Sequence, residues 1–355
     1  MIIYFSAQLP SRRVPVAGQK IAWNNLKDLA DPKDLILFSF INNIEKPFFK
    51  KSDYNGYKKT YFHFVSKSAR LMNCIKNIFY PLKVSGRYSD IIFEKLKNEV
   101  ESNDIKKIFF EFTSSMLYAK KIKEFFPHLE IHFVEHDVTY QSYKRLINSK
   151  NLFNKLFYFF EYNRMKYFEV KVLKKLDFVY TLNSKDLQLL KENNITNVSI
   201  KYPRVEDWIY NVNRNNIEKY SILFLGAMHR NENKQAVKWF VINIIPKLIS
   251  IFPNLKFYVV GGGVSESIKK LQNKNIVITG YVENLEHFFE KAQVAVVPLS
   301  YGAGIKIKTV ETISANITTI ASKIGAEGVD KNEFLKIANS KEEFIELIKK
   351  EFSNV

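Results

Sequence analysis

Cysteine is almost absent from the sequence: Cys74 is the one cysteine in 355 residues. An internal disulfide is therefore excluded, and a reducing compartment fits the chain. No apolar run approaches the length of about 18 residues that a membrane-spanning helix needs. Residues 1–10 have no basic start and only a short apolar run. They predict a first β-strand rather than a signal peptide, and we expect a cytoplasmic protein.

Acidic residues are also in deficit, with 36 Asp and Glu against 54 Lys and Arg, for a formal net charge of +18. Residues 1–200 carry +13 of this charge and residues 201–355 carry +5. The first half of the chain should therefore attract anionic partners, whether a membrane, a nucleic acid or a phosphorylated substrate. The length and the hydrophobic share of 46% favour two globular domains.

Apolar runs alternate with amphipathic stretches along the chain, which predicts an α/β fold built from parallel βαβ units. We expect one domain at 1–202, a polar, asparagine-rich linker at 203–220 and a second domain at 221–355. The strands expected in the second domain are 221–225, 255–260, 275–279, 294–299 and 318–322, with helices at 234–249, 265–271, 285–291 and 305–315. Ligands of open α/β sheets bind beyond the carboxyl ends of the strands. Glycines at those ends should therefore line one crevice.

A strand–turn–helix segment near residue 300 carries the clearest functional pattern. Gly302 and Gly304 allow a sharp turn and close approach to a ligand. Lys306 and Lys308 fall in the first turn of the expected helix, where the helix dipole disfavours cations but an anion would be held. Glu311 follows Lys308 by three residues, on the same face. The pattern predicts that lysines bind a pyrophosphate and Glu311 binds ribose hydroxyls; the alternative is solubilising lysines and a Glu311–Lys308 pair.

Four stretches of the second half, in this order, resemble the retaining glycosyltransferases of family 4. They are Leu225–Met228 with Trp239 and Phe240, Val259–Gly263, Thr279–Val282, and Gly302–Glu311 followed by Ile324–Val329. The resemblance implies the GT-B fold, in which two Rossmann-like doubly wound domains face a cleft, and a nucleotide-sugar donor. It implies donor contacts from Gly226, Arg230, Gly262, Tyr281, Val282, Tyr301, Gly302, Gly304, Lys306, Lys308 and Glu311.

The first half resembles the same family at two points. Gly18 is similar to a glycine of the loop that approaches the donor phosphates, and His136 resembles a histidine that faces the sugar. The resemblance implies catalytic roles for His136, Lys308 and Glu311, while a loop histidine without a role is the alternative for His136. The sequence departs from the family at Ala303, where many members carry the first of two glutamates. The role near the sugar that the family assigns to that first glutamate therefore does not apply to this sequence.

A metal site is not expected. His128, His132 and His136 recur every four residues, which would suit metal binding on a helix. Pro127 and the strand-like residues 131–134 argue against a helix there.

The resemblance implies a hexosyltransferase-like enzyme that transfers a sugar from a nucleotide-sugar to a glycan or lipid-linked acceptor. The transfer should retain the anomeric configuration and should need neither a metal ion nor a cofactor. Cell-surface polysaccharide biosynthesis is the expected setting. The alternatives are a nucleotide-sugar epimerase of the same fold and a basic nucleic-acid-binding module. A nicotinamide enzyme is disfavoured, because the glycine run at 261–263 lacks the rest of a dinucleotide signature.

Residues 46–87 combine ten Lys and Arg with many aromatic residues and a single acid, Asp53. This composition suits an anionic membrane surface or a phosphorylated lipid, and also single-stranded nucleic acid. A solvated loop above ordinary core aromatics is equally compatible. We expect peripheral association with the inner face of the cytoplasmic membrane through the basic first domain, and no nucleic-acid partner.

Overall fold

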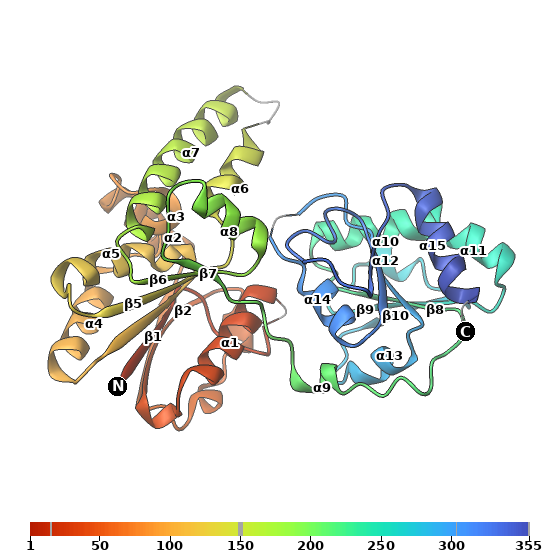
Figure 1. The fold of residues 1–355 in the computed structure, drawn as a ribbon, viewed down its shortest axis with the longest axis horizontal. Helices are drawn as coiled ribbons and strands as arrows, with labels where there is room; N and C mark the ends of the chain where they lie inside the picture. The colour runs from red at the N-terminus through yellow and green to blue at the C-terminus, as the bar shows by residue number, and fades with distance from the viewer. Residues whose placement is uncertain (15, 148–151, 303, 354–355) are drawn as a thin grey trace. The chain divides into compact units, whose positions relative to one another are not determined.

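The computed structural model describes residues 1–14, 16–147, 152–302 and 304–353. They form two compact units, Met1–Arg204 and Val205–Val355. Each unit is built on a wholly parallel sheet with helices on both faces (Figure 1). The predicted α/β class, with two Rossmann-like doubly wound sheets, is confirmed.

The N-terminal unit has a seven-stranded sheet in the order β3-β2-β1-β4-β5-β6-β7. Its strands are β1 (Ile2–Ser6), β2 (Leu35–Asn42), β3 (Lys59–Val65), β4 (Lys107–Glu111), β5 (Glu130–Glu135), β6 (Phe178–Thr181) and β7 (Val198–Ile200). Its helices are α1 (Ala17–Leu29), α2 (Lys67–Lys76), α3 (Leu82–Ser85), α4 (Asp90–Ser102), α5 (Met116–Phe125), α6 (Thr139–Leu146), α7 (Leu152–Leu173) and α8 (Ser184–Lys191). Successive residues of β1 enter different cores, Phe5 on one face of the sheet and Tyr4 on the other. Burial of both faces explains why the strands are continuous apolar runs.

The C-terminal unit has a six-stranded sheet in the order β10-β9-β8-β11-β12-β13. Its strands are β8 (Ser221–Leu225), β9 (Lys256–Val260), β10 (Ile276–Gly280), β11 (Val294–Val297), β12 (Thr318–Ala321) and β13 (Leu335–Ile337). Its helices are α9 (Asp207–Tyr210), α10 (Asn231–Asn243), α11 (Ile245–Ile251), α12 (Glu266–Lys269), α13 (Glu286–Lys291), α14 (Ile307–Ser314) and α15 (Lys341–Ser353). Two clusters of buried residues, one containing Phe224 and Phe257 and one containing Leu223 and Phe289, form its core.

Strand order reverses once in each sheet, between β1 and β4 and between β8 and β11. Connections leave the sheet in opposite directions at such a point, which opens a crevice beyond the carboxyl ends of the two strands. The segments that follow these four strands are therefore where a ligand site is expected in each unit.

One expectation about the elements is wrong, and several elements were not predicted. A single helix over 234–249 is replaced by α10 and α11, because Pro246 in the first turn of α11 can neither donate a hydrogen bond nor continue the preceding helix. Residues 46–87, for which a solvated loop was one alternative, contain β3, α2 and α3, with Tyr54 and Val65 buried. Strand β13 and helix α15 were not predicted. In the segment 203–220, Val205 and Ile209 pack into the C-terminal unit.

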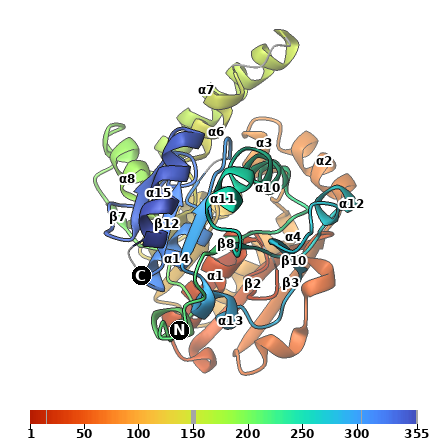
Figure 2. The same cartoon turned by 90° about the vertical axis from the view of Figure 1, so that its right-hand side faces the viewer.

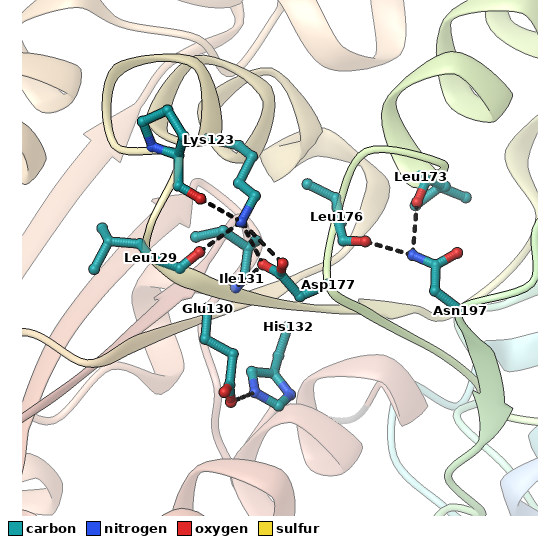
Figure 3. Close-up of polar contacts among 10 residues, drawn as sticks. Lys123, Leu129, Glu130, Ile131, His132, Leu173, Leu176, Asp177 and Asn197 are labelled. Atoms are coloured by element: carbon teal, nitrogen blue, oxygen red, sulfur yellow. Dashed lines mark hydrogen bonds and ion pairs between the residues drawn. The ribbon is translucent and has the colours of Figure 1, made fainter.

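A polar network ties the start of β5 to the turn before β6 (Figure 3). Lys123 on α5 forms an ion pair with Asp177 at 2.7 Å and donates to the carbonyl of Leu129, while Asp177 accepts from the backbone N–H of Ile131 at 2.7 Å. His132 contacts the carboxylate of Glu130 and stacks between aromatic rings of neighbouring strands. His132 therefore has a structural role, and it lies on a strand rather than on a helix.

None of the helices in the described part of the chain combines the length and the apolar character needed to cross a bilayer.

Candidate functional site

Backbone turns at the ends of β8, β9 and β10 interlock in the C-terminal unit. The N–H of Gly226 donates to the carbonyl of Val260 at 3.0 Å, and that of Gly261 donates to Gly280 at 3.0 Å. A Cβ atom on Gly261 would lie 2.0 Å from the carbonyl oxygen of Gly226, and the φ of Gly261 is +148°. The strands can end this close together only with glycine at these positions.

Lys308 enters this surface from α14, the helix that follows β11. Its ammonium donates to Oδ1 of Asn233 on α10 at 2.7 Å and lies 4.4 Å from the centroid of the Phe224 ring. The amide of Asn233 is fixed in turn by donation to the carbonyl of Ala227 at 2.9 Å. A Cβ atom on Gly226 would lie 2.7 Å from the Lys308 nitrogen. The cation is therefore held at the point where the strand order reverses.

Burial lowers the pKa of Lys308 to about 7, and the nearby Arg230 guanidinium and Lys306 ammonium act in the same direction. The carboxylates of Glu232 and Glu311 oppose the shift. Lys308 forms no ion pair with either carboxylate, and neighbouring cations disfavour its charged form. Binding of a phosphate group here would favour the charged form of Lys308.

The turn before α14 uses glycines in the left-handed region, Gly302 at φ +134° and Gly304 at φ +73°. The helix begins at Ile307, so Lys306 is its N-cap rather than part of its first turn. The Lys306 ammonium donates to the carbonyl of Gly304 and lies 3.7 Å from the Glu327 carboxylate. Lys306 thus braces the turn, and Ala303 lies outside the described residues.

Glu311 lies one turn of helix after Lys308 and is partly exposed. Its carboxylate makes no hydrogen bond or ion pair with any residue that the structure describes, and Lys308 bonds to Asn233 instead. The alternative of a structural Glu311–Lys308 ion pair is therefore not observed. A carboxylate without a hydrogen-bond partner near a cation that forms no ion pair is suited to a ligand bearing hydroxyl and phosphate groups.

The other residues predicted to contact the donor differ in how accessible their side chains are to a ligand. Arg230 is already paired with Glu232 at the start of α10. Tyr281 is 74% exposed and packs beside Gly262, so a ring face is accessible next to the glycine turns. Tyr301 is 40% exposed. The side chain of Val282 packs against the core of the unit, which restricts it to backbone contacts.

His136 lies in the N-terminal unit, directly after β5. Its Nε2 contacts the carboxylate of Glu111, at the end of β4, at 2.5 Å, and Asn25 on α1 donates to the same carboxylate at 2.8 Å. The ring stacks on Phe112 with centroids 4.0 Å apart. Nδ1 is buried and has no hydrogen-bond partner among the described residues. Because a carboxylate only accepts, Nε2 carries the proton of the neutral ring, and Nδ1 of that ring presents its lone pair.

We expected Gly18 to lie in a loop, but it lies in the first turn of α1. A Cβ atom there would lie 3.0 Å from the Phe112 ring and 3.5 Å from His136 Nδ1. Gly18 therefore allows the start of α1 to approach the stacked His136–Phe112 pair. The N-terminal unit brings Gly18 and His136 together, and the C-terminal unit brings Gly226, Lys308 and Glu311 together.

Three residues of these sites escaped the sequence reasoning: Asn233, Glu111 and Asn25. Glu111 closes an apolar strand with an acid at its carboxyl end, and that signal could have identified it. Asn233 and Asn25 carry no such signal, since asparagine is common in this chain and their partners are distant in sequence. Within the described residues, no group of three or more His, Cys, Asp or Glu side chains could hold a metal ion.

We predict that Glu111→Gln lowers both stability and activity. The amide cannot accept from His136 and Asn25 together as the carboxylate does, so the free energy of unfolding should fall by about 1–3 kcal/mol. Nitrogen NMR of the ring should place the His136 proton on Nε2 in the wild type and on a mixture of both nitrogens in the variant. A wild-type ring protonated on Nδ1 would contradict this assignment.

Two parallel-sheet units of six and seven strands, each with a polar cluster where the strand order reverses, define a GT-B-like α/β protein. Solved structures of low sequence identity share this fold. Sucrose-phosphate synthase from Thermosynechococcus elongatus aligns over 100% of this chain and 90% of its own, with 13% identity and a TM-score of 0.66. Anabaena Alr3699/HepE in complex with UDP and glucose aligns over 99% and 89%, with 10% identity and a TM-score of 0.63. WaaG, a glycosyltransferase involved in lipopolysaccharide biosynthesis, aligns over 99% and 90%, with 12% identity and a TM-score of 0.53.

Sequence comparison agrees with this fold. The model of the family "Glycosyl transferases group 1" matches residues 219–354, which lie within the C-terminal unit. A curated relative, the "Uncharacterized 44.6 kDa protein in cps region" of Klebsiella pneumoniae, is 25% identical over 209 residues. That alignment covers 56% of this chain and about half, 53%, of the relative. The predicted family resemblance is confirmed.

Proposed function

We propose that the protein transfers a glycosyl group from a nucleotide-sugar to a glycan or lipid-linked acceptor, with retention of anomeric configuration. The observation that carries the proposal is the Lys308–Glu311 arrangement at the strand reversal of the C-terminal unit. It places a partly buried amine that forms no ion pair near a carboxylate that has no hydrogen-bond or ion-pair partner among the described residues. The group 1 family match of this same unit supports the assignment.

The donor is held by its nucleoside diphosphate. Glu311 accepts hydrogen bonds from the two ribose hydroxyls, and Lys308 binds the pyrophosphate together with the N–H groups at the start of α14. The exposed ring of Tyr281, beside Gly262, contacts the base. The solved neighbour HepE was crystallised with UDP, which agrees with a nucleotide of this kind.

Charge develops on the leaving diphosphate as the glycosidic bond breaks. The Lys308 ammonium and the helix N–H groups lie where they stabilise that charge more strongly in the transition state than in the ground state. The departing phosphate takes the acceptor proton, so no enzymic nucleophile and no metal ion are needed. In the N-terminal unit, His136 offers the Nδ1 lone pair to a sugar hydroxyl, and Glu111 fixes the tautomer.

The acceptor belongs to cell-surface polysaccharide or glycolipid assembly. A relative encoded in a cps region and a neighbour that acts in lipopolysaccharide biosynthesis support this setting.

The proposal is tested by incubating the purified protein with a nucleotide-sugar that it binds, in the presence and in the absence of an acceptor. The nucleoside diphosphate should be released, and the sugar transferred, only when acceptor is added, and NMR of the product should show the donor's anomeric configuration. Epimerised sugar from donor alone would indicate an epimerase and contradict transfer. An inverted product would contradict retention alone.

A further inference from the structure

The N-terminal half of α7 presents an unusual apolar surface. Six large apolar side chains there, between 41% and 77% exposed, are Leu152, Phe153, Leu156, Phe157, Phe159 and Phe160. At 3.6 residues per turn they occupy an arc of about 160°. We call these six residues the apolar prong. Both views show this part of α7 extending away from the sheet of its own unit (Figures 1 and 2).

The C-terminal half of the same helix packs into the core through the opposite side. Its buried residues are Glu161, Met165, Phe168, Glu169, Val172 and Leu173. Their arc is centred about 170° from that of the apolar prong. The prong therefore points away from the domain that holds the helix, and packing of α7 on its own core cannot cover it.

A second exposed apolar surface lies on α2 and the turn after it. Helix α2 has no buried residue. Its exposed apolar residues and those of the turn, between 53% and 93% exposed, are Leu71, Met72, Ile75, Ile78 and Phe79. We call these five residues the α2 patch.

Contacts from the middle of α7 join the α2 patch to the apolar prong. Arg164 donates to the carbonyls of Ile78 and Tyr80, and Glu161 accepts from the backbone N–H of Leu82 at 3.0 Å. Arg164 and Glu161 also pair with each other. The α2 patch and the turn after it therefore adjoin the middle of α7, and the apolar prong lies on the N-terminal half of the same helix.

The charged residues within the two segments that carry these surfaces are all cations. Lys67–Lys76 contains three cations and no acid, and Leu152–Phe160 contains Lys155 and no acid. An exposed apolar surface of this size marks an interaction site. Basic side chains beside aromatic and aliphatic ones match the interface of an anionic bilayer, where apolar residues enter the acyl boundary and cations meet lipid phosphates.

We propose that the apolar prong and the α2 patch dock the protein on anionic lipid membranes. A second copy of the chain is a poorer occupant, because each copy carries a net charge of +18 and like-charged faces repel. The docking surface is specific: it resides on α7 and α2, rather than on the basic first domain as a whole. The proposal does not depend on transferase activity.

Vesicle flotation of the full chain tests the proposal. The wild type should bind vesicles of phosphatidylcholine with phosphatidylglycerol, should not bind pure phosphatidylcholine, and should be released by salt. Leu156→Ser with Phe160→Ser should weaken binding by about tenfold or more. Lys155→Gln should weaken it about fivefold.

Ile91→Ser with Phe125→Ser is the matched control. Ile91 and Phe125 are 69% and 57% exposed, against 62% and 59% for Leu156 and Phe160, and lie on α4 and α5 of the same unit. The control should bind like the wild type, and both pairs should melt like the wild type because the residues are exposed. Absence of wild-type binding, or equal loss in the control, would overturn the proposal. So would a wild-type dimer, without vesicle binding, that the Leu156/Phe160 pair converts to a monomer in light scattering.

Discussion

Lys308→Met should lower kcat by about 100- to 1000-fold. Methionine retains much of the packing against Phe224 and Gly226 but removes the cation that contacts Asn233 at the strand reversal. Loss of a single group that stabilises developing charge in a closed site has an effect of this size. Steady-state kinetics of nucleoside diphosphate release measures it. Lys323→Met, at an exposed lysine of the same unit, is the control and should keep wild-type kcat.

Lys308 should also make donor binding depend on pH. Below its pKa of about 7 the amine is already charged, so affinity should be constant. Above that pH the complex must take up a proton, because the bound phosphates favour the ammonium, and Kd should rise by about tenfold per pH unit. Calorimetry in buffers of different ionisation enthalpy would detect the proton uptake. A Lys308→Met variant with the same pH dependence would contradict the assignment.

Glu311→Ala should reduce donor affinity by about 100-fold or more. The carboxylate has no partner among the described residues, so its removal costs the fold little and takes two charge-assisted hydrogen bonds from the ligand. Equilibrium binding of the donor and of the nucleoside diphosphate should weaken together, since the ribose is common to both. Glu346→Ala, at an exposed helix position on α15, is the control. An unchanged affinity would remove Glu311 from the site.

The fold was predictable because local pattern and tertiary burial agree in it. Strands such as β8 and β11 are buried on both faces, and they appear in the sequence as uninterrupted apolar runs between amphipathic helices. The missed element β3 sits at the sheet edge with most residues partly exposed, so its sequence mixes polar and aromatic residues and resembles a loop. The expected helix over 234–249 failed for a local reason, the proline in the first turn of α11.

The candidate site was predictable where one short segment contains it. Gly302, Gly304, Lys308 and Glu311 lie within ten residues, and the glycine conformations and the helix start agree with the pattern. Asn233 lies 75 residues from Lys308, and Glu111 lies 25 residues from His136. Such partners meet only when the sheet brings the ends of its strands together. The pairing register of those strands cannot be deduced from a single sequence.

The contacts of the Lys306 side chain could not be predicted from its position in the sequence. Its position at the helix start suggested an anion ligand, yet its ammonium turns back to Gly304 and toward Glu327. Lys308, two residues later, is held by Asn233 and forms no ion pair with any described residue. The difference lies in the neighbours that each side chain meets in three dimensions.

Thermal denaturation with a panel of UDP-, GDP-, ADP- and dTDP-sugars tests the central claim most directly, because a ligand that binds only the native state raises the melting temperature by mass action. We predict that one nucleotide class stabilises the wild type, by about 2.7 kcal/mol at a concentration of 100 times Kd, and that Glu311→Ala abolishes the shift. A wild type that no member of the panel stabilises, or a Glu311→Ala variant that shifts as the wild type does, would contradict a nucleotide-sugar site at Lys308 and Glu311.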